Sequence, residues 1–500
     1  MTFFVYFITL LLYIYVYQNT ICDLFLLFPD SNLLNPDLVL NNRMDIKYNF
    51  LRYLSQLLYN KHSETEVIMN QRLISLFLSA CLCAGLSGCG KTNIDGGSGI
   101  ARQSSAVKEL GSDIAVGAKP APVDSYEELK NGVNKFAFAL YDALPKDSNC
   151  FYSPYSISSA LSMLDQGAGS DTKTELESVL GIADLSEWNH EMQSYLNKEW
   201  SEQTFVNTAN SIWMTDQKEW AANISDDFLL PAKTYYHGEI YEADFTNQAD
   251  QVVKDVNGWV SGHTNQMIPS IVDELPPATV MMLINAVYFE GKWQTPFVEE
   301  DTYDDIFHGT NGDSTVPMMH LYGEQFAYID IGSIKGIMLP YDGDSVVMKV
   351  FLPSQEGDTI SALFDALSND EKQALIDSLD TADDKEIQTV QLPKFTDEQG
   401  INGLDDILKN LGIRSAYTSA DFSRIADDIA VSSVTHRAKV IVDENGTKAA
   451  AVTDIMVAET AAMETEETYT FIVDRPFVYV IEDQDTGMIL FVGRGNDLVK

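Results

Sequence analysis

The sequence predicts an α+β protein with mainly mixed and antiparallel sheets. In the main part of the chain, short amphipathic helical patterns come first, strand patterns occur throughout, and strands end it, an order typical of this class. Hydrophobic residues make up 45% and aromatic residues 11% of the 500 residues. This composition provides for a large buried core and differs from that of a disordered chain. The chain contains no internal repeat of sequence.

Charge and cysteine content exclude several classes of partner. With 74 acidic and 32 basic residues, the formal net charge is −42. Nucleic acid and anionic membrane surfaces should therefore repel the chain. Cysteines occur as Cys22, Cys81, Cys83, Cys89 and Cys150. Only Cys150 lies in the expected domain, so no disulfide is expected within it.

Residues 1–68 do not have the pattern of a folded domain. They are rich in Phe, Tyr, Leu, Ile and Asn and show no clear amphipathic period. We expect this segment to lie upstream of the true start of the protein. The alternative is an additional N-terminal membrane segment, although the apolar run Phe3 to Tyr17 is shorter than the roughly 20 residues of a membrane-spanning helix.

Residues 69–88 have the layout of a secretory signal peptide. Arg72 supplies positive charge, an apolar run from Leu73 to Gly85 follows, and Leu86-Ser87-Gly88-Cys89 resembles a bacterial lipobox. We expect Cys89 to be lipidated, so that the protein is extracytoplasmic and contacts a membrane only through this N-terminal anchor, or is secreted. Residues 89–125 are rich in Gly, Ser, Ala and Pro and are expected to form a flexible tether.

Two catalytic motifs in this region are interpreted as coincidences. Gly85 to Thr92 fits the phosphate-loop pattern GxxxxGK[ST], but the glycine-rich sequence after it does not predict the helix that such a loop requires. A phosphate-loop NTPase therefore remains a distant third hypothesis. Ser105 to Lys108 matches SxxK in the expected tether, without supporting motifs.

The rest of the chain, residues 126–499, is expected to form one domain. Tyr126 to Leu144 has a helical apolar period that ends at Pro145, and Asp171 to Leu180 predicts a further helix. Pro154 suits a first helical turn, where Ser153 and Ser156 can bond free backbone groups. Strand patterns include Phe205 to Met214, Leu283 to a turn at Gly291, and a hairpin of Phe471 to Ile481 with Met488 to Gly493.

The stretch from Asp443 to Met463, DENGTKAAAVTDIMVAETAAM, has an unusual alternation. It is rich in small residues and contains neither proline nor aromatic residues. Side chains alternate between the two faces of a strand. Neither charged nor large residues occur in one alternate set, which consists of Thr447, Ala449, Ala451, Thr453, Ile455 and Val457. This segment is therefore a loop that is also able to enter a sheet as a strand.

Several of these sequences resemble the serpin family over nearly all of residues 126–499. The matching strings are Asn149 to Ile157, Val256 to Val260, Leu283 to Trp293, Leu392 to Phe395, Val434 to Ala438, Asp474 to Phe477 and Phe491 to Arg494. The resemblance implies the serpin fold, with three β-sheets, a helical cap and an exposed reactive loop. It identifies the loop hinge as Glu444, Gly446, Thr447, Ala449, Ala450 and Ala451.

The resemblance also assigns residues beneath the large sheet. Ser153, Ser156, Asn285 and His436 are expected to form a polar cluster that lets the strands part, and Trp213 is expected beneath the point where the loop inserts. Without the resemblance, His436 would be interpreted as an ordinary buried core histidine. The family's usual spacing from Glu444 puts the reactive bond between Thr460 and Ala461, with Ala458, Ala462 or Met463 at the bond if the register slips.

A suicide-type inhibitor of serine proteases is the function that the resemblance implies. The loop offers small or medium uncharged residues at the bond, which favours elastase-like or subtilisin-like targets over trypsin-like ones. A cysteine protease is a further possible target, and the inhibitor is expected to be a monomer. The alternative is a non-inhibitory serpin that acts as a binding protein. The histidines do not cluster, and HExxH, Cys-x-x-Cys and GxSxG motifs are missing, so no enzyme activity, metal or cofactor is expected.

Overall fold

A computed structural model of the chain describes residues 106–115, 120, 122–217, 224–276, 278–343, 345–355, 357–401, 403–447 and 468–498. The expected signal peptide, Cys89 and residues 1–68 lie outside the described residues. Helices and two mixed sheets make up the described part, so the α+β prediction is confirmed. Cys150, the cysteine of the domain, is a buried free thiol.

One sheet combines strands from the N-terminal and C-terminal halves of the domain. In the described part of the chain it has seven strands. In spatial order they are β1 (Val107–Leu110), β4 (Glu239–Ala243), β3 (Thr204–Thr215), β5 (Met281–Lys292), β14 (Gly446–Thr447), β13 (Ser433–Asp443) and β12 (Phe395–Gly400).

Among the described residues, ten further strands are hydrogen-bonded into a second sheet. Two of the three expected sheets are joined in it, because β8 pairs with β9 at one end and with β11 at the other. Its path is β2 (Cys150–Tyr152), β17 (Met488–Gly495), β16 (Phe477–Asp483), β10 (Val346–Pro353), β9 (Ile334–Pro340), β8 (Glu324–Ile331), β11 (Asp384–Pro393), β7 (Gly312–Leu321) and β6 (Tyr303–Gly309), with β15 (Tyr469–Ile472) beside β11.

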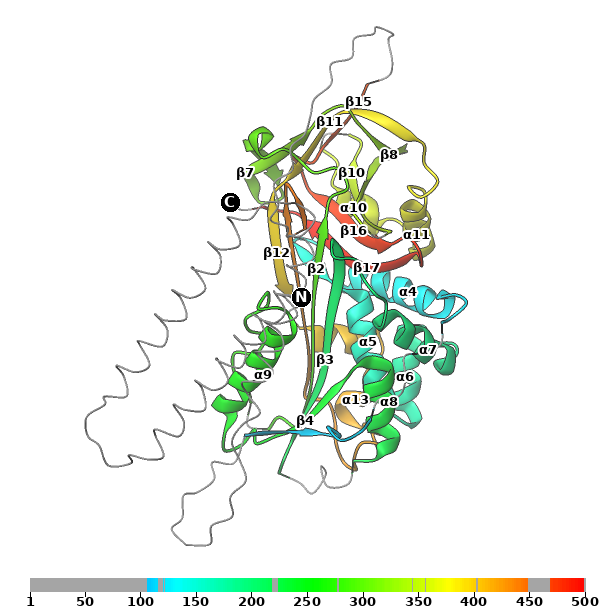
Figure 1. Ribbon diagram of the computed structural model, residues 1–500, viewed down its shortest axis with the longest axis vertical. Helices are drawn as coiled ribbons and strands as arrows, with labels where there is room; N and C mark the ends of the chain where they lie inside the picture. The colour runs from blue at the N-terminus through cyan, green and yellow to red at the C-terminus, as the bar shows by residue number, and fades with distance from the viewer. Residues whose placement is uncertain are drawn as a thin grey trace, which may run out of the picture. The chain divides into compact units, whose positions relative to one another are not determined.

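Helices cover both faces of the first sheet (Figure 1). On one face lies α9 (Ala249–His263), whose Val252, Val256 and Val260 pack in a cluster with Trp213 and Ile284. On the other face lies a helical group that shares the main core with β3, β5 and β13. The described helices besides α9 are α4 (Glu127–Ala143), α5 (Pro154–Asp165), α6 (Ser170–Leu180), α7 (Leu185–Leu196), α8 (Asp226–Tyr236), α10 (Ile360–Asp365), α11 (Asn369–Asp377), α12 (Leu404–Leu411) and α13 (Ser415–Thr418), with a 3-10 turn at Glu299–Asp301.

Local sequence signals explain where helix α5 begins, and this helix contributes residues to the candidate site described below. Ser153 is the N-cap of α5 and accepts a hydrogen bond from the Ser156 N–H at 3.0 Å, and Pro154 is the first helical residue, as expected. Every residue of α5 is buried. The helix therefore lies wholly inside the domain, against the sheet, and its polar side chains must find partners there.

Two strand boundaries differ from those expected. β5 continues through Gly291 to Lys292 rather than turning at the glycine. The expected strand from Phe471 to Ile481 is two strands, because Pro476 lacks the N–H that a ladder needs. As a result β15 pairs in parallel with β11, whereas β16 forms the hairpin with β17.

Part of the expected tether belongs to the fold, which corrects that prediction. Val107 to Leu110 form β1, which pairs antiparallel with β4 and so extends the first sheet by one edge strand. Leu110 is 7% exposed, and Glu109 forms an ion pair with Lys233 of α8 at 3.0 Å. A strand of four residues is too short to show a period, and the Gly-rich and Ser-rich composition around it hides the signal.

We expect Leu110→Ala to lower the stability of the native domain by about 2 kcal/mol, because the substitution removes a buried side chain that holds β1 against the core. The matched control is Lys108→Ala in the same strand, whose side chain is 71% exposed. The measurement is the urea midpoint of native unfolding for both variants. Equal midpoints for the two variants would show that β1 is not packed on the domain.

Candidate functional site

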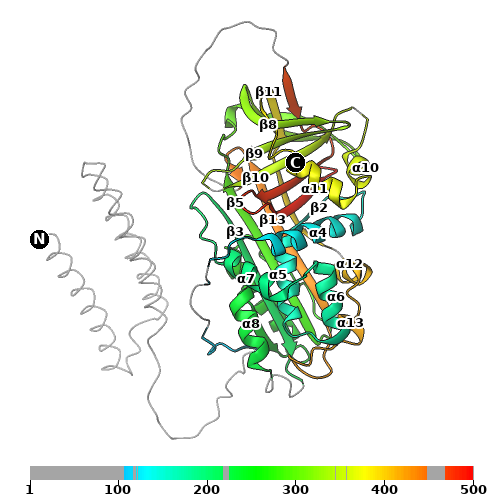
Figure 2. The same ribbon diagram turned by 90° about the vertical axis from the view of Figure 1, so that its right-hand side faces the viewer.

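The candidate site is the junction at which the chain leaves β13 and turns back into the sheet. Over their lower part β5 and β13 pair directly and in parallel, from Met282 opposite Ser433 to Tyr288 opposite Lys439. Figure 2 shows β3, β5 and β13 side by side in the sheet. At its upper end this pair separates and admits β14, which is antiparallel to both neighbours. The sheet thus contains the first two residues of a strand between β5 and β13.

Gly446 begins this short strand in a conformation that demands glycine. Its φ is +144°, and a Cβ there would lie 2.2 Å from the carbonyl oxygen of Gly291 and 2.6 Å from the Cα of Lys292. Any side chain would force the two strands apart. The expected hinge glycine is therefore required by the close approach of the chain to β5.

Thr447 shows which side of the incoming strand faces the interior. It is fully buried, and its hydroxyl lies 2.8 Å from the hydroxyl of Tyr341. Its cross-strand neighbours are Gly291 on β5 and Val442 on β13, and Val442 is also fully buried. The interior face is thus the face of the uncharged set that starts at Thr447 in the sequence.

Glu444 fixes the turn before this strand. Its carboxylate accepts a hydrogen bond from the Lys394 ammonium at 2.6 Å, and its carbonyl oxygen accepts one from the Phe297 N–H at 2.8 Å. Burial raises the pKa of Glu444, but the hydrogen bond and the positive charge of Lys394 lower it more, so the carboxyl pKa lies below its ordinary value. The turn is therefore held by a charge-assisted bond.

Trp293, not Trp213, lies at the insertion point. The Trp293 indole N–H donates to the carbonyl oxygen of Asp443 at 3.0 Å, and the Trp293 N–H donates to the Asn445 carbonyl oxygen at 3.0 Å. Its ring is 3% exposed and stacks on Tyr341 with centroids 4.5 Å apart. Trp293 therefore binds the hinge through both its backbone and its side chain.

The prediction for Trp213 is wrong in position. β3 pairs with β5 so that Thr204 is opposite Gly291, next to β14, whereas Trp213 is opposite Met282. At about 3.3 Å per residue, Trp213 is roughly 30 Å farther along the strand. Its ring is buried and stacks on Tyr241, with centroids 4.3 Å apart, in the cluster beneath α9. The Gly291-Lys292-Trp293 sequence at the end of β5 was the signal for the correct residue.

The structure brings Ser153, Ser156, Asn285 and His436 together in one hydrogen-bonded cluster. The Ser153 N–H donates to His436 Nε2 at 3.2 Å, so the proton is on Nδ1, which donates to the Asn285 side-chain oxygen. The Asn285 amide donates in turn to the Ser156 hydroxyl at 2.7 Å and to the Asn210 side-chain oxygen at 2.6 Å. Asn210 was not expected. The cluster joins the start of α5 to β3, β5 and β13.

His436 and Asn285 hold the two parallel strands together. They are direct cross-strand partners, and each is 1% exposed. Burial lowers the pKa of His436 from 6.5 to about 3, so the ring is neutral. A neutral imidazole both donates and accepts here, and protonation would replace the acceptor Nε2 by a donor facing the Ser153 N–H.

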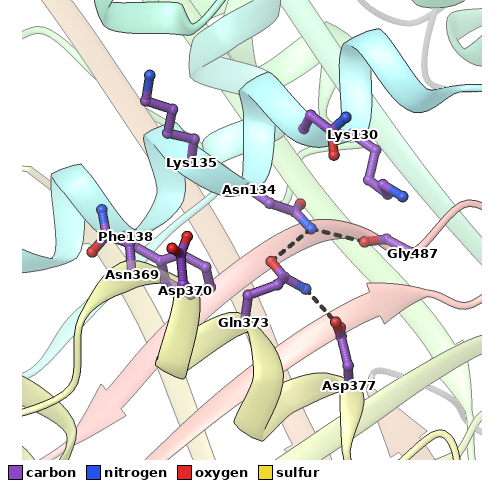
Figure 3. Close-up of a pocket in the computed structure, with 10 residues that line it drawn as sticks. Lys130, Asn134, Lys135, Phe138, Asn369, Asp370, Gln373, Asp377 and Gly487 are labelled. Carbon is purple, nitrogen blue, oxygen red and sulfur yellow. Dashed lines mark hydrogen bonds between the residues drawn. The ribbon is translucent and has the colours of Figure 1, made fainter.

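Other features of the described part do not add a reactive centre. An open cavity of about 550 Å³ lies between α4, α11 and the turn at Gly487 (Figure 3). There the Asn134 amide donates to the Gln373 side-chain oxygen at 3.1 Å and to the Gly487 carbonyl oxygen at 2.9 Å. The described residues contain no group of His, Cys, Asp and Glu placed to hold a metal ion, and no helix among them is long and apolar enough to cross a membrane.

Six predicted positions lie outside the described residues. They are the hinge residues Ala449, Ala450 and Ala451, the reactive-bond residues Thr460 and Ala461, and the lipidation residue Cys89. For these the sequence predictions stand as stated. The described residues include the strands on either side of the loop in the sequence, β14 before it and β15 after it.

The family model described as "Serpin (serine protease inhibitor)" matches residues 131–498. An uncharacterized serpin-like protein of Thermococcus kodakarensis is 33% identical over 388 residues, covering 75% of this chain and 88% of the relative. Leukocyte elastase inhibitor A of Mus musculus is 31% identical, covering 74% of this chain and 99% of the relative. The native crystal structure of Tengpin, a thermophilic serpin, superposes with a TM-score of 0.68 at 28% identity, covering 78% of this chain and all of that one.

We expect acid to destabilise the native domain through His436. Its pKa is about 3 in the folded chain and about 6.5 when exposed, so the unfolded chain binds the proton first as the pH falls. The stabilisation is complete above pH 6.5 and is lost progressively toward pH 3, by about 2 kcal/mol between pH 7 and pH 5.

The measurement is the free energy of unfolding from urea titrations at pH 7, 6 and 5 for the wild type and His436→Gln. The variant should lose less stability over this range than the wild type. His190→Gln, which changes an exposed histidine on α7, serves as the control and should keep the wild-type loss. A His436→Gln variant with the full wild-type pH dependence would contradict the buried neutral imidazole.

Proposed function

Because the chain belongs to the serpin family, we propose that it inhibits serine proteases by inserting its cleaved loop into the large sheet. The observation that carries this proposal is β14. Two residues of the future strand already lie between β5 and β13, paired to both. The remaining uncharged set of the loop follows directly in the sequence.

The register of β14 predicts which residues the inserted strand would pair with. Thr447 is opposite Gly291 on β5 and Val442 on β13. In an antiparallel pair each step forward on one strand is a step back on the other, so Thr453 would lie opposite Asn285 and His436. Insertion would therefore separate the two residues that now bond across β5 and β13, and would put a threonine hydroxyl between them.

Insertion is favoured by pairing and by burial. The parallel β5–β13 pairing would be replaced by two antiparallel ladders, and parallel pairing is slightly less stable per residue. Ile455 and Val457 belong to the face that enters the core, and burying each contributes about 1.5–3 kcal/mol. The intact loop is tethered at β14 and at β15, so the insertion waits until the chain between them is cut.

The protease supplies the covalent chemistry in this proposal. Its catalytic serine attacks the carbonyl carbon of the loop residue before the reactive bond, the amine of the following residue leaves, and the loop remains as an acyl ester on the serine. Insertion then carries the protease along the sheet before water can hydrolyse the ester. The inhibitor contributes the cleavable loop and the strand that inserts.

The proposed targets have shallow apolar pockets. Between Asp454 and Thr470 the loop contains no basic residue, so a pocket with an acidic base has nothing to bind. Thr460 before the bond and Ala461 after it suit elastase-like or subtilisin-like enzymes. The similarity to a protein named leukocyte elastase inhibitor A supports this class.

Ala449→Arg should convert the inhibitor into a substrate. Thr447 already lies in the sheet, so in the proposal Ala449, the next residue of the uncharged set, is the first side chain of this face to be buried on insertion. An unpaired charge there costs several kcal/mol, so insertion should become slower than deacylation. Incubation with an elastase-like protease should give cleaved, released inhibitor. The matched control is Lys448→Arg, on the alternate face, which should still give complexes that survive denaturant. Stable complexes with Ala449→Arg would show that the insertion face is wrongly assigned.

A protease panel tests the specificity. Incubation with elastase, subtilisin, trypsin and chymotrypsin should give denaturant-stable complexes with elastase or subtilisin, and the released C-terminal peptide should begin at Ala461. Complexes with trypsin alone would contradict the specificity. Cleavage without a stable complex for every serine or cysteine protease tested would favour the binding-protein alternative.

A further inference from the structure

An aromatic stack lies on the second sheet, close to the strand that follows the loop. The Tyr303 ring of β6 stacks on His320 of β7 with centroids 4.1 Å apart, and His320 lies 6.1 Å from the ring of Tyr322. Tyr303 is 51% and Tyr322 50% exposed, although His320 between them is 1% exposed. Two large half-exposed rings therefore cover a buried histidine and leave an apolar surface open to solvent.

Hydrogen bonds fix the histidine ring against which the tyrosines lie. His320 Nδ1 donates to the carbonyl oxygen of Asp301 at 2.9 Å, and its Nε2 accepts from the Gln391 amide of β11 at 2.8 Å. The ring thus joins the turn Glu299–Asp301 to β7 and β11. A preorganised aromatic surface loses little side-chain entropy on binding, and tyrosine is enriched among the residues that dominate protein interfaces.

The stack is adjacent to the loop exit. His320 is the cross-strand partner of Gln391, and Gln391 is the partner of Ile472 on β15. Gly323, next to Tyr322, donates to the carbonyl oxygen of Ile387, which is opposite Tyr469, the first residue of β15. Strands are about 4.8 Å apart, so β7 lies roughly 10 Å from β15. Figure 1 shows β7, β11 and β15 together at one end of the domain.

The border of the stack is acidic. Between Trp293 and Ile334 the chain contains no lysine or arginine, and its charged residues apart from histidine are all acidic. Glu299 and Glu300 are exposed, and no ion pair within the described ranges neutralises them. This composition opposes contact between two copies of the chain and favours a cationic partner.

We propose that the stack of Tyr303, His320 and Tyr322, with its acidic border, is a docking surface for a protease whose surface beside the active-site cleft is basic. The inference rests on the proposed inhibition. β15 follows the reactive bond in the chain, so the contact is made with the side of the protease cleft that holds the residues after the bond. One partner of a standard interface covers about 800 Å², roughly 30 Å across, which is wide enough to include both the start of β15 and the stack.

The docking surface should set the rate of association and leave the trap itself unchanged. The test measures the association rate constant of the full chain with a cationic elastase-like protease. Tyr322→Ala should slow association about five- to tenfold, and Glu299→Gln with Glu300→Gln should slow it several-fold at low salt. At about 1 M salt, where charges are screened within roughly 3 Å, the effect of the glutamate pair should disappear and that of Tyr322→Ala should persist.

Matched controls lie on α8, at the opposite end of the domain in Figure 1. Leu230→Ala changes another exposed apolar residue, 45% exposed, and Asp226→Asn with Asp227→Asn changes an exposed acidic pair. These variants should associate at the wild-type rate. All variants should keep the thermal midpoint and the yield of stable complex per loop cleaved.

Two outcomes separate the docking surface from the proposed function. If the wild type forms no stable complex with any protease, the proposed inhibition fails and the docking inference fails with it. If stable complexes form but Tyr322→Ala and the glutamate pair associate at the wild-type rate, inhibition stands and the docking surface is contradicted. A self-association that disappears in Tyr322→Ala would also overturn the proposal, because the surface would then bind a second copy of the chain.

Discussion

The direct pairing of β5 with β13 is the constraint on which the rest of the domain depends. The two strands are parallel neighbours over their lower part and are held apart above it by Gly446 and Thr447. Asn285 and His436 close the lower part by a hydrogen bond between their side chains, and Ser153 fixes the imidazole from the cap of α5. A small polar contact between side chains therefore reinforces the backbone pairing that closes the sheet.

A hydrogen-bonded contact between Asn285 and His436 suits a sheet that must open to admit a new strand. A buried polar network is stable only when each group has a partner, and here the partners come from three different strands and a helix cap. Apolar side chains at the same positions would offer an incoming strand no hydrogen-bond partners, so the closed sheet would be harder to open. In the proposed mechanism Thr453 takes its place between Asn285 and His436, so that a hydroxyl replaces the bond that is broken. Trp293 and Glu444 hold the hinge ready above this point.

Much of the fold and of the site could be predicted from the sequence where the signal is local. The cap of α5 at Ser153 and the alternation from Thr447 follow from residue chemistry within a few positions, whereas the hinge glycine and the polar cluster were predicted from the resemblance to the serpin family. Features that depend on cross-strand register could not be predicted. Trp213 lies in β3 and Trp293 directly follows β5, and only the alignment of β3 with β5 shows which one lies beneath the hinge. The stack of Tyr303 on His320 likewise joins two strands, and β1 is too short to show a period.

The most direct measurement is the crystal structure of the protein after cleavage within the loop. The account predicts that the segment from Thr447 to about Val457 forms a full strand between β5 and β13, antiparallel to both. Thr453 should lie between Asn285 and His436, whose direct bond should be gone. A cleaved protein in which β5 and β13 still pair from Met282 opposite Ser433 to Tyr288 opposite Lys439, as they do now, would contradict the account.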